Sequence, residues 1–348
     1  MSALQSAQRI LIVRLSAIGD VMHAVPVLNA LRDAMPGAFL AWVVEGRTAE
    51  LLRGHRALDE LITIERGWLK SPRTVVDLRR RLRSLRFDTT IDLQGLSKSA
   101  IVAWLSGAPR RIGLAGRDGR EISRWLNNEL VAPTRTHITQ RSLDLLAPLG
   151  ITAPAVRFDL HENPADAFTA GKILGSHHVS APFAVINPGA SWPSKRWPPE
   201  RFAAVARHLG QSRGLGSLVV WAGDEERGWA EQIMAGSAGH ATLAPPTTLG
   251  ELAAIVRRAA IFVGSDTGPL HVAAAVGTPC VGLFGPMPSE RNGPYGPQHI
   301  TVQKMWLTGT GRDRRTAGPG SMEAIAVEHV TEACDRILDR GHLIRRSA

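Results

Sequence analysis

Residues 9–26 read RILIVRLSAIGDVMHAVP, and this stretch decides the fold. The part up to Leu15 is rich in Ile, Leu and Val, which predicts a buried strand. Small residues form a turn at 16–20, and a helical segment follows. A strand that passes through a tight turn into a helix begins a βαβ unit, so the stretch predicts an α/β protein with a parallel sheet.

Short apolar runs of the same kind recur along the chain, with helical stretches between them. The first set lies at 38–44 (AFLAWVV), 61–64 (LITI) and 89–93 (TTIDL). The pattern starts afresh with runs at 183–187 (FAVIN), 217–223 (SLVVWAG), 260–266 (AIFVGSD) and 280–285 (CVGLFG). Because this alternation is typical of parallel sheets with crossover helices, its restart predicts two α/β units.

The boundary between the units is expected in residues 151–166, which are rich in proline and polar residues and weak in helical period. A length of 348 residues suits two domains, since domains cluster near about 100 to 200 residues. We expect a first domain at 1–160, a linker region at 161–181, a second domain at 182–320 and a C-terminal closing helix at 321–348. Residues 308–320, TGTGRDRRTAGPG, are expected to form a mobile loop.

The composition is that of a globular protein, with 44% hydrophobic and 21% charged residues. No apolar run approaches the roughly 20 residues that span a bilayer, and the apolar stretch at 10–13 is too short for a secretory signal. Only Cys280 and Cys334 are present, which argues against a disulfide framework and a structural zinc site. These features predict a cytoplasmic protein.

Positive charge exceeds negative charge and is concentrated in one segment. The chain has 41 Lys and Arg residues against 31 Asp and Glu residues, which favours an anionic partner. Residues 66–86 are named the basic segment below. They contain one acidic residue, Asp77, and eight basic residues: Arg66, Lys70, Arg73, Arg79, Arg80, Arg81, Arg83 and Arg86. The apolar spacing predicts an amphipathic helix. The residues expected to turn inward are Val75, Val76, Leu78, Leu82 and Leu85. The arginine face is either a solvated surface or a surface for an anionic membrane or lipid headgroup.

The turn at Ser16 to Asp20 is the first candidate site, because ligands of open α/β sheets bind outside the carboxyl ends of the strands. Gly19 permits a tight turn and the close approach of a ligand to the backbone. On spacing alone, the simpler interpretation of Asp20 is a helix cap that accepts a backbone N–H of the first turn. His23, one turn later, is either a partner of this site or a structural histidine.

Residues 187–198, NPGASWPSKRWP, form a second candidate between a strand and a helix. Gly189 and Ser191 offer backbone N–H groups and Lys195 adds a cation, a combination that suits a phosphate. The spacing of a Walker A loop is absent. A proline-rich connector with surface tryptophans explains the stretch equally well.

The strongest candidate is residues 264–286, GSDTGPLHVAAAVGTPCVGLFGP. A strand delivers Asp266 into a turn, Thr267 and Gly268 open a helix, and His271 lies one turn into it. The amides of a helix N-terminus favour an anion, and a hydroxyl and an imidazole converge on the same point. The alternative is that Asp266 or Thr267 only caps the helix and His271 only packs in the core. That alternative does not explain why His271 lies one turn after the cap, so the pattern favours an anion-binding site.

Signatures of several other functions are absent from the sequence. There is no H-x-x-x-H, clustered-Cys or D-x-D pattern, so no catalytic metal is expected. The kinase signature set is also missing. Interleaved aromatics and recognisable RNA or DNA motifs are lacking, so no nucleic-acid partner is expected.

Six segments together resemble glycosyltransferase family 9, the ADP-heptose-dependent heptosyltransferases. They are ILIVRLSAIGDVMHAVP, RGWLKSP, IDLQGLSKSA and DGREISRWLNNE in the first half, and KRWP and SDTGPLHVAAAVGTP in the second. The pairing of an N-terminal S-x-x-G-D with a later D-T-G-x-x-H is the most specific part. The resemblance implies a GT-B fold of two Rossmann-like domains whose parallel sheets face a central cleft, with the acceptor held by the first domain and ADP-heptose by the second.

The resemblance also implies roles for residues at matching positions. Asp20 is implied as the general base, and Lys195 as the support of the departing diphosphate. The implied donor site consists of Ser191, Asp224, Thr247, Asp266, Thr267, Gly268 and His271. The implied acceptor site consists of Ser16, Gly19, His23, Arg66, Lys70, Gln94, Lys98 and Arg120.

The implied function is inverting, metal-independent transfer of heptose from ADP-heptose to Kdo of the lipopolysaccharide inner core, without a cofactor. The acceptor would be an anionic glycolipid, lipid A–Kdo. The basic segment would then face the anionic inner membrane and hold the protein peripherally on its cytoplasmic side. The alternatives are another donor sugar, a protein or polysaccharide acceptor, or a non-catalytic nucleotide-sugar binding protein.

Overall fold

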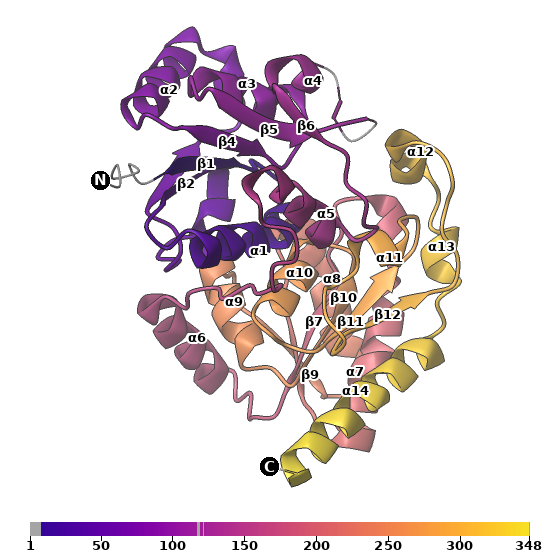
Figure 1. Ribbon diagram of the computed structural model, residues 1–348. Coiled ribbons are helices and arrows are strands. Elements are labelled where there is room, and N and C mark those ends of the chain that lie inside the picture. The colour runs from indigo at the N-terminus through magenta and orange to yellow at the C-terminus, as the bar shows by residue number, and fades with distance from the viewer. Residues whose placement is uncertain (1–7, 117–118, 121, 348) are drawn as a thin grey trace. The chain divides into compact units, whose positions relative to one another are not determined.

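The computed structural model describes residues 8–116, 119–120 and 122–347. The chain divides between His161 and Glu162 into two compact units. Each unit contains one six-stranded parallel sheet with helices beside it (Figure 1). This arrangement confirms the α/β fold class and the two units that the restart of the strand pattern predicts.

Unit 1 is the N-terminal unit. Its strands are β1 (Arg9–Val13), β2 (Phe39–Glu45), β3 (Glu60–Ile64), β4 (Thr89–Asp92), β5 (Arg110–Leu114) and β6 (Glu129–Val131). They form a sheet in the order β3-β2-β1-β4-β5-β6. Its helices are α1 (Ile18–Ala34), α2 (Pro72–Ser84), α3 (Ser97–Leu105), α4 (Ser123–Leu126) and α5 (Ile138–Asp144), with the 3₁₀ helices η1 (Gly46–Leu51), η2 (Trp68–Lys70) and η3 (Ala147–Leu149).

The central strand β1 is covered on both faces, and its residues Ile10–Val13 are 0% exposed. Leu11 belongs to a buried cluster with Leu82 of α2 and Val102 of α3. Helix α1 covers the opposite face (Figure 1) and is buried from Val21 to Leu31. Burial on both faces explains why the strand is continuously apolar instead of alternating.

Helix α2 is amphipathic, as its sequence predicts, with one exception. Leu78 and Leu82 are buried, and Val75 and Leu85 pack partly buried against the same cluster. Val76, which was expected to turn inward, is 53% exposed. It lies about 100° around the helix from Val75, which places it off the apolar stripe.

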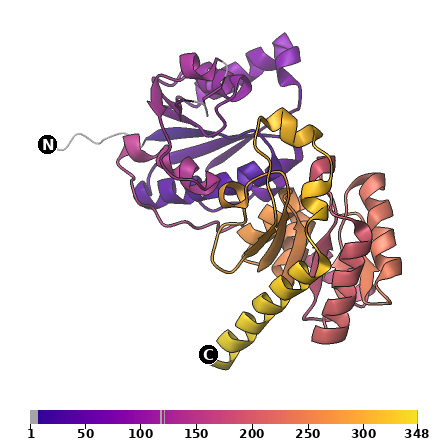
Figure 2. The ribbon, with the colours of Figure 1, turned by 90° about the vertical axis from the view of Figure 1, so that its right-hand side faces the viewer.

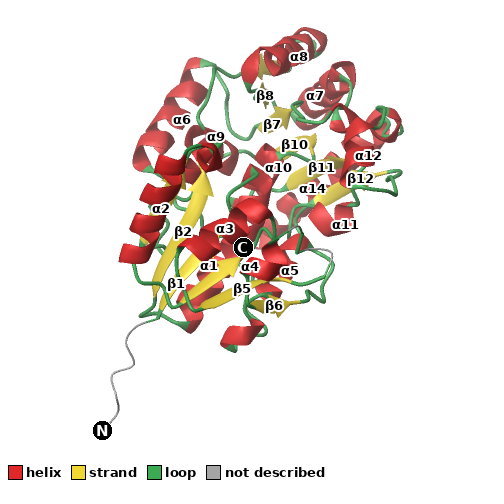
Figure 3. Cartoon of the chain, turned by 90° about the horizontal axis from the view of Figure 1, so that it is seen from above, coloured by secondary structure: helices red, strands yellow, loops and turns green. Residues whose placement is uncertain are grey.

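Unit 2 follows. Its strands are β7 (Ala184–Asn187), β8 (Ser217–Val219), β9 (Ala241–Leu243), β10 (Ile261–Ser265), β11 (Cys280–Phe284) and β12 (Ile300–Gln303). They form a sheet in the order β12-β11-β10-β7-β8-β9 (Figure 3). Its helices are α6 (Pro164–Ser176), α7 (Pro199–Arg213), α8 (Gly223–Gly236), α9 (Leu249–Arg257), α10 (Gly268–Ala275), α11 (Ser289–Asn292), α12 (Gly311–Thr316), α13 (Gly320–Glu323) and α14 (Val327–Ser347), with the 3₁₀ helix η4 (Pro193–Lys195).

Both sheets have the same strand order. Counted from the first strand of each unit, the order is 3-2-1-4-5-6, which is that of dinucleotide-binding Rossmann folds. The order reverses between β1 and β4 in unit 1 and between β7 and β10 in unit 2. At such a switch point the loops leave the carboxyl ends of the strands toward opposite faces and make room for a ligand.

Phe202 and Trp197 lie in the core of unit 2. Phe202 is 0% exposed, and its ring meets that of Trp197 edge-on with 4.8 Å between centroids. The indole N–H of Trp197 donates to the carbonyl of Ile325 at 2.9 Å. Helix α14 adds Val330 and Ile337 to the same cluster (Figure 2), so this helix closes the core.

Residues 161–181, expected as a linker region, contain helix α6. Asn163 caps this helix by accepting the N–H of Ala165 at 2.9 Å, and Pro164 occupies its first turn. Helix α6 packs against α9 within unit 2. From Glu162 on, the segment is therefore part of the second unit, which begins earlier than residue 182.

Residues 308–320, expected as a mobile loop, contain helix α12 and the start of α13. Thr310 and Asp313 form a capping box at the N-terminus of α12. The expected closing helix corresponds to α14, which begins at Val327. Local capping thus gives regular structure to a stretch whose glycine and arginine content suggests a loop.

Replacing Phe202 with Ala is expected to lower the free energy of unfolding by about 3–5 kcal/mol, because a fully buried ring is replaced by a cavity. The matched control is Phe168→Ala on α6, where the ring is 70% exposed and the expected change is within about 0.5 kcal/mol. Guanidinium unfolding followed by circular dichroism measures both. Equal destabilisation by the two substitutions would contradict the place of Phe202 in the core.

Candidate active site

Three loops at the carboxyl edge of the unit 1 sheet bring polar side chains together. They follow β1, β2 and β4, with β1 lying between the other two strands. The residues that they contribute are Arg14, Ser16 and Asp20 after β1, Glu45 at the end of β2, and Gln94 and Lys98 after β4. This edge includes the switch point of unit 1, where a ligand site is expected.

Asp20 is the third residue of α1, directly after Gly19, and its carboxylate has two partners. One oxygen accepts the N–H of Ala17 at 3.2 Å, and the other lies 2.8 Å from the guanidinium of Arg14. The Arg14 side chain is 8% exposed, whereas that of Asp20 is 39% exposed. Asp20 therefore caps α1, as its spacing predicts, and still presents an accessible carboxylate.

Arg14 is held by the loop between β4 and α3. Its guanidinium donates to the carbonyl of Leu93. In the same region, the side-chain oxygen of Gln94 accepts the N–H of Leu15 at 2.8 Å. These bonds join the turn after β1 to the loop after β4, and they fix the direction from which Arg14 meets Asp20.

Lys98 links all three loops. Its ammonium donates to Ser16 Oγ at 3.0 Å and to Glu45 Oε2 at 2.8 Å. The Glu45 side chain is 7% exposed and that of Lys98 is 30% exposed, so the ammonium keeps an open side. Glu45 is not among the site residues predicted from the sequence. The one feature that could have indicated it is its position as the first polar residue after the apolar run AFLAWVV.

A buried carboxylate organises the loop that carries Gln94. Asp92, at the end of β4, is 0% exposed and accepts the N–H groups of Gln94 at 3.0 Å and Gly95 at 3.1 Å. A third bond comes from the side-chain amide of Asn127 at 3.1 Å. Burial raises the pKa of Asp92 above its ordinary value, and the hydrogen bonds offset part of this effect. Arg120 is brought to the same loop, because its N–H donates to the carbonyl of Gly95 at 2.9 Å.

His23 lies one turn beyond Asp20 but contacts a different element. It is 4% exposed, and its Nδ1 lies 2.9 Å from Thr139 Oγ1 on α5. Its ring also meets the ring of His137, the cap of α5, edge-on. The structure places His23 in the contact between α1 and α5, which agrees with its interpretation as a structural histidine.

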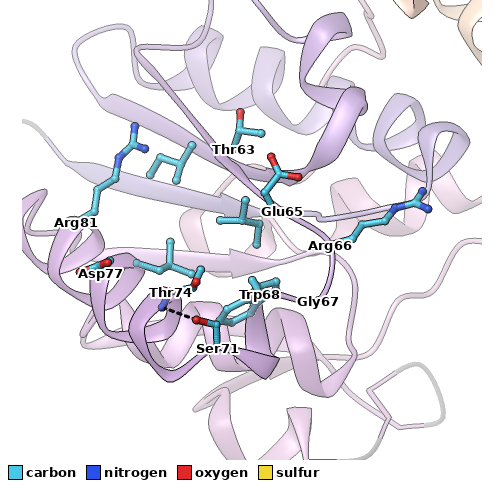
Figure 4. Close-up of a pocket in the computed structure, with 12 residues that line it drawn as sticks. Thr63, Glu65, Arg66, Gly67, Trp68, Ser71, Thr74, Asp77 and Arg81 are labelled. Carbon is cyan, nitrogen blue, oxygen red and sulfur yellow. Dashed lines mark hydrogen bonds between the residues drawn. The ribbon is translucent and has the colours of Figure 1, made fainter.

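Arg66 and Lys70 follow β3, two strands away from β1 in the sheet. Both are exposed. Arg66 borders a pocket of about 470 Å³ between the end of β3 and α2, and Arg81 borders its other side (Figure 4). Arg66 and Lys70 thus lie on the same edge of the sheet as the switch point, but outside its hydrogen-bonded cluster.

In unit 2, three side chains form a buried charged cluster where β7 and β10 end. Asp266 directly follows β10, Lys195 ends η4 after β7, and His271 is the fourth residue of α10. Lys195 Nζ lies 2.5 Å from Asp266 Oδ2, and His271 Nε2 lies 3.2 Å from Asp266 Oδ1. The structure therefore joins the second and third candidate segments into one site.

Burial alone would raise the pKa of Asp266. The ammonium of Lys195 and the hydrogen bond from His271 outweigh this effect and hold the pKa of Asp266 below its ordinary value. Asp266 is therefore ionised at neutral pH, and its charge balances that of Lys195. This balance lets Lys195, with a side chain only 15% exposed, stay charged beside the protein interior.

Thr267 and Gly268 begin α10 beside this cluster. Thr267 is the N-cap residue, and its hydroxyl donates to the carbonyl of Ser265 at 3.2 Å. The first N–H groups of a helix have no partner within it and carry the positive end of its dipole. Together with Lys195, they make this point favourable for a phosphate.

Ser191, Asp224 and Thr247 lie on the same edge of the unit 2 sheet. Ser191 and Thr247 are in the loops after β7 and β9, and Asp224 is in the first turn of α8, which follows β8. Ser191 and Asp224 are exposed, and Thr247 is half-buried. Neighbouring strands are about 4.8 Å apart, so the order β10-β7-β8-β9 carries these residues progressively away from Asp266. They extend the site along the sheet.

Glu226 is a residue of this edge that sequence analysis misses, although the motif WAGDEE contains it. Its carboxylate accepts the N–H of Ala222 at 2.9 Å, and burial raises the pKa of Glu226. A Cβ atom at Gly189 would lie 2.3 Å from Glu226 Oε2. Glycine therefore allows the loop after β7 to lie against this carboxylate.

The two units offer complementary chemistry. Unit 1 presents a carboxylate anchored by a buried arginine, and such a group can accept the proton of a hydroxyl. Unit 2 presents an ammonium and helix amides that can stabilise phosphate charge. Within the described part of the chain, no group of three or more His, Cys, Asp or Glu side chains is placed to hold a metal ion.

Comparison with known proteins gives a consistent result. The sequence model of glycosyltransferase family 9 (heptosyltransferase) matches residues 75–313. Lipopolysaccharide heptosyltransferase 1 of Pseudomonas aeruginosa is 31% identical over 84% of this chain and 82% of its own length. The protein of the same name from Salmonella typhimurium is 28% identical over 83% of this chain and 92% of its own length. These similarities confirm the resemblance that the sequence motifs indicate.

Solved structures share the fold. The glycosyl transferase family 9 protein from Veillonella parvula has a TM-score of 0.85 at 23% identity and covers 97% of this chain and 100% of its own. E. coli heptosyltransferase WaaC with ADP-2-deoxy-2-fluoro heptose has a TM-score of 0.72 at 24% identity and covers 94% of this chain and 99% of its own. With the two six-stranded parallel sheets, this likeness confirms the expected GT-B fold.

Lys195→Met is expected to destabilise the protein in a pH-dependent way, because it leaves the carboxylate of Asp266 buried without its cation. Breaking such a pair costs about 3–5 kcal/mol when the carboxylate is ionised. A lowered Asp pKa stabilises the fold above the unfolded value of about 4, and this contribution is lost as the pH falls through the folded value. In the variant, burial without the Lys195 cation raises the pKa of Asp266, so the carboxylate takes up a proton as the pH is lowered from 7 toward 4, and the difference in unfolding free energy between wild type and variant should shrink.

Urea unfolding across this pH range measures the effect. Lys172→Met is the matched control, since Lys172 is an exposed lysine of α6, and its smaller effect should not depend on pH. A difference for Lys195→Met that grows toward acidic pH would contradict the coupling of Lys195 to Asp266.

Proposed function

The chain belongs to glycosyltransferase family 9 and is a glycosyltransferase, and from this premise we propose that it transfers heptose from ADP-heptose to Kdo of the lipopolysaccharide inner core. One observation carries the proposal. An accessible carboxylate in unit 1, Asp20 on Arg14, is matched by a phosphate-suited cluster in unit 2, Lys195 and Asp266, and each lies at the switch point of its own sheet. The carboxylate suits an acceptor hydroxyl, and the phosphate-suited cluster suits an activated donor.

The proposed step is a single displacement. Asp20 takes the proton of the acceptor hydroxyl while the hydroxyl oxygen attacks the anomeric carbon of the heptose. The bond from that carbon to the diphosphate breaks, and ADP leaves with the bonding electrons. Attack on the face opposite the leaving group inverts the anomeric configuration. Lys195 and the amides of α10 supply the positive charge at the leaving group, so the proposed step uses no metal ion and no cofactor.

The acceptor side of the proposal uses the unit 1 edge. Kdo carries a carboxylate, and the partly open ammonium of Lys98 beside Ser16 suits such a group. Arg120 contacts the loop that carries Gln94 through its backbone N–H, which donates to the carbonyl of Gly95. Arg66 and Lys70 continue the positive charge along the same edge, in keeping with an acceptor that carries further anionic groups, such as lipid A.

The donor side uses the unit 2 edge. The diphosphate would meet Lys195 and the first turn of α10. Gly268 in that turn has no side chain that would keep a ligand away from the backbone N–H groups. Ser191 and Thr247 in the neighbouring loops, and Asp224 in the first turn of α8, can hydrogen-bond the nucleoside and sugar hydroxyls. His271 is oriented by its hydrogen bond to Asp266 and lies in the same cluster.

A peripheral position on the cytoplasmic face of the inner membrane is part of the proposal. Helices α2, α3 and α4 cover one face of the unit 1 sheet (Figure 1). Their outer surface carries arginines of the basic segment, with Arg73 and Arg80 side chains 94% and 76% exposed. Trp104 on α3 is 50% exposed and Trp125 on α4 is 81% exposed. Arginine binds anionic headgroups, and tryptophan prefers the membrane–water interface. Among the described residues, no helix has both the length and the apolar character to cross a membrane.

Asp20→Asn is expected to lower the rate of heptosyl transfer about 10²- to 10⁴-fold, since the amide cannot accept the proton of the acceptor. The substitution keeps the size of the side chain and an oxygen that can cap α1. The assay follows transfer from ADP-heptose to Kdo-bearing lipid A. Binding of ADP, measured by calorimetry, should stay near that of the wild type, because the proposed donor site lies in unit 2.

Asp33→Asn is the matched control. Asp33 lies on the same helix α1 and pairs with Arg157 on the surface, so its substitution should leave the transfer rate within about twofold of wild type. Wild-type turnover by Asp20→Asn would contradict the role of Asp20 as base. A wild-type protein that binds and uses UDP-sugars instead of ADP-heptose would contradict the proposed donor.

The double substitution Trp104→Ala and Trp125→Ala is expected to weaken binding to vesicles that contain phosphatidylglycerol by about tenfold or more. Burying a large side chain contributes roughly 1.5–3 kcal/mol, and 1.4 kcal/mol corresponds to tenfold. Co-sedimentation measures the binding, which should also fall with added salt. Trp306→Ala in unit 2, where the ring is 52% exposed, is the matched control and should not change it. Equal binding to uncharged vesicles, or no effect of the double substitution, would contradict the proposed membrane surface.

A further inference from the structure

Helix α12 lies against η4, the element that carries Lys195. The hydroxyl of Ser194, which is 0% exposed, donates to the carbonyl of Arg314 at 2.8 Å. The Arg314 side chain in turn donates to the carbonyl of Leu307 at 2.9 Å. These bonds and the capping box of α12 hold the segment in place beside the donor cluster of unit 2.

This packing brings a second cation to the ring of Trp192, the residue before η4. Lys195 Nζ lies 4.5 Å from the centroid of the Trp192 ring. Arg315 Cζ, from α12, lies 5.1 Å from the same centroid. Two cations from segments more than 100 positions apart in the sequence therefore lie within about 10 Å of each other, each held near the ring by cation–π attraction.

The two cations differ in their charge balance. Lys195 is paired with the buried carboxylate of Asp266, which offsets part of the positive charge that its ammonium presents to a ligand. Arg315 is exposed and has no carboxylate partner within the residues that the structure describes. A leaving diphosphate gains negative charge as its bond to the sugar breaks, and an arginine that is not neutralised by a carboxylate is suited to stabilise that charge.

We propose that Arg315 binds the diphosphate of the nucleotide-sugar donor, together with Lys195 and the first turn of α10. The inference rests on the proposed function, because it takes the donor to lie at the Asp266 cluster. It adds a residue from α12, in the segment whose composition predicts a loop. Arg315 supplies the net positive charge of this site, and its planar guanidinium can contact two phosphate oxygens at once.

The test compares wild type, Arg315→Ala and Arg315→Lys in calorimetric binding of ADP and of AMP. Arg315→Ala should weaken ADP binding about tenfold or more, as expected for the loss of a charge-assisted hydrogen bond. AMP lacks the second phosphate, so its binding should change less. Arg315→Lys keeps the positive charge but loses the planar guanidinium that can contact two phosphate oxygens. Its ADP affinity should therefore lie between those of wild type and Arg315→Ala. With ADP-heptose and acceptor, kcat/KM of Arg315→Ala should fall at least as much as ADP affinity, because charge on the leaving group rises in the transition state.

Arg207→Ala is the charge-matched control, because Arg207 is an exposed arginine of α7 in the same unit. It should leave ADP affinity within about twofold of wild type. If the wild type binds ADP and Arg315→Ala binds it equally well, the assignment of Arg315 is overturned and the proposed function stands. If the wild type binds no ADP, both are overturned.

Discussion

In each unit, the chain first adds strands on one side of its first strand and then crosses back to add strands on the other side. All the strands are parallel, so their carboxyl ends share one edge, and the crossing separates the loops beside β1 and β7. Space for a ligand at that edge is a consequence of topology and needs no special residue. Most residues of the proposed acceptor and donor sites lie on the loops of these edges or in the first turn of the helices that follow them, and changing the strand order would scatter them.

In both sites an accessible charged side chain is held by a buried side chain of opposite charge, and the signs of the two charges are reversed between the units. In unit 1 a buried arginine, Arg14, holds an accessible carboxylate. In unit 2 a buried carboxylate, Asp266, holds a partly accessible lysine. In each pair the buried member is hydrogen-bonded further into the protein, to Leu93 in one case and to His271 in the other. An opposite charge therefore holds the accessible group in one orientation without covering it, which is the arrangement that the proposed catalysis by preorganised charges requires.

The fold and the turns at Asp20 and Asp266 could be predicted from the sequence, because apolar runs, small turn residues and caps act over a few neighbouring positions. Glu45 and Arg315 could not, since each reaches its site from another element, and such a contact depends on how strands and helices pack. The segment 308–320 shows a related limit. Its capping box is visible in the sequence, but a six-residue helix is stabilised mainly by what it packs against. Local patterns therefore predicted the framework of each site better than the partners that complete it.

The close approach of Glu226 to Gly189 links two positions that are 37 residues apart in the sequence. A side chain at position 189 would push the carboxylate away from the N–H of Ala222, and a bulkier residue at 226 would push on the backbone of the loop after β7. Because the contact is with the far end of a flexible side chain, a small residue at position 189 could fit if the Glu226 carboxylate turned away and gave up its bond to Ala222. A residue larger than glycine at position 189 is therefore expected to come with a different orientation of the Glu226 side chain, so the loop after β7 and the start of α8 share one local arrangement.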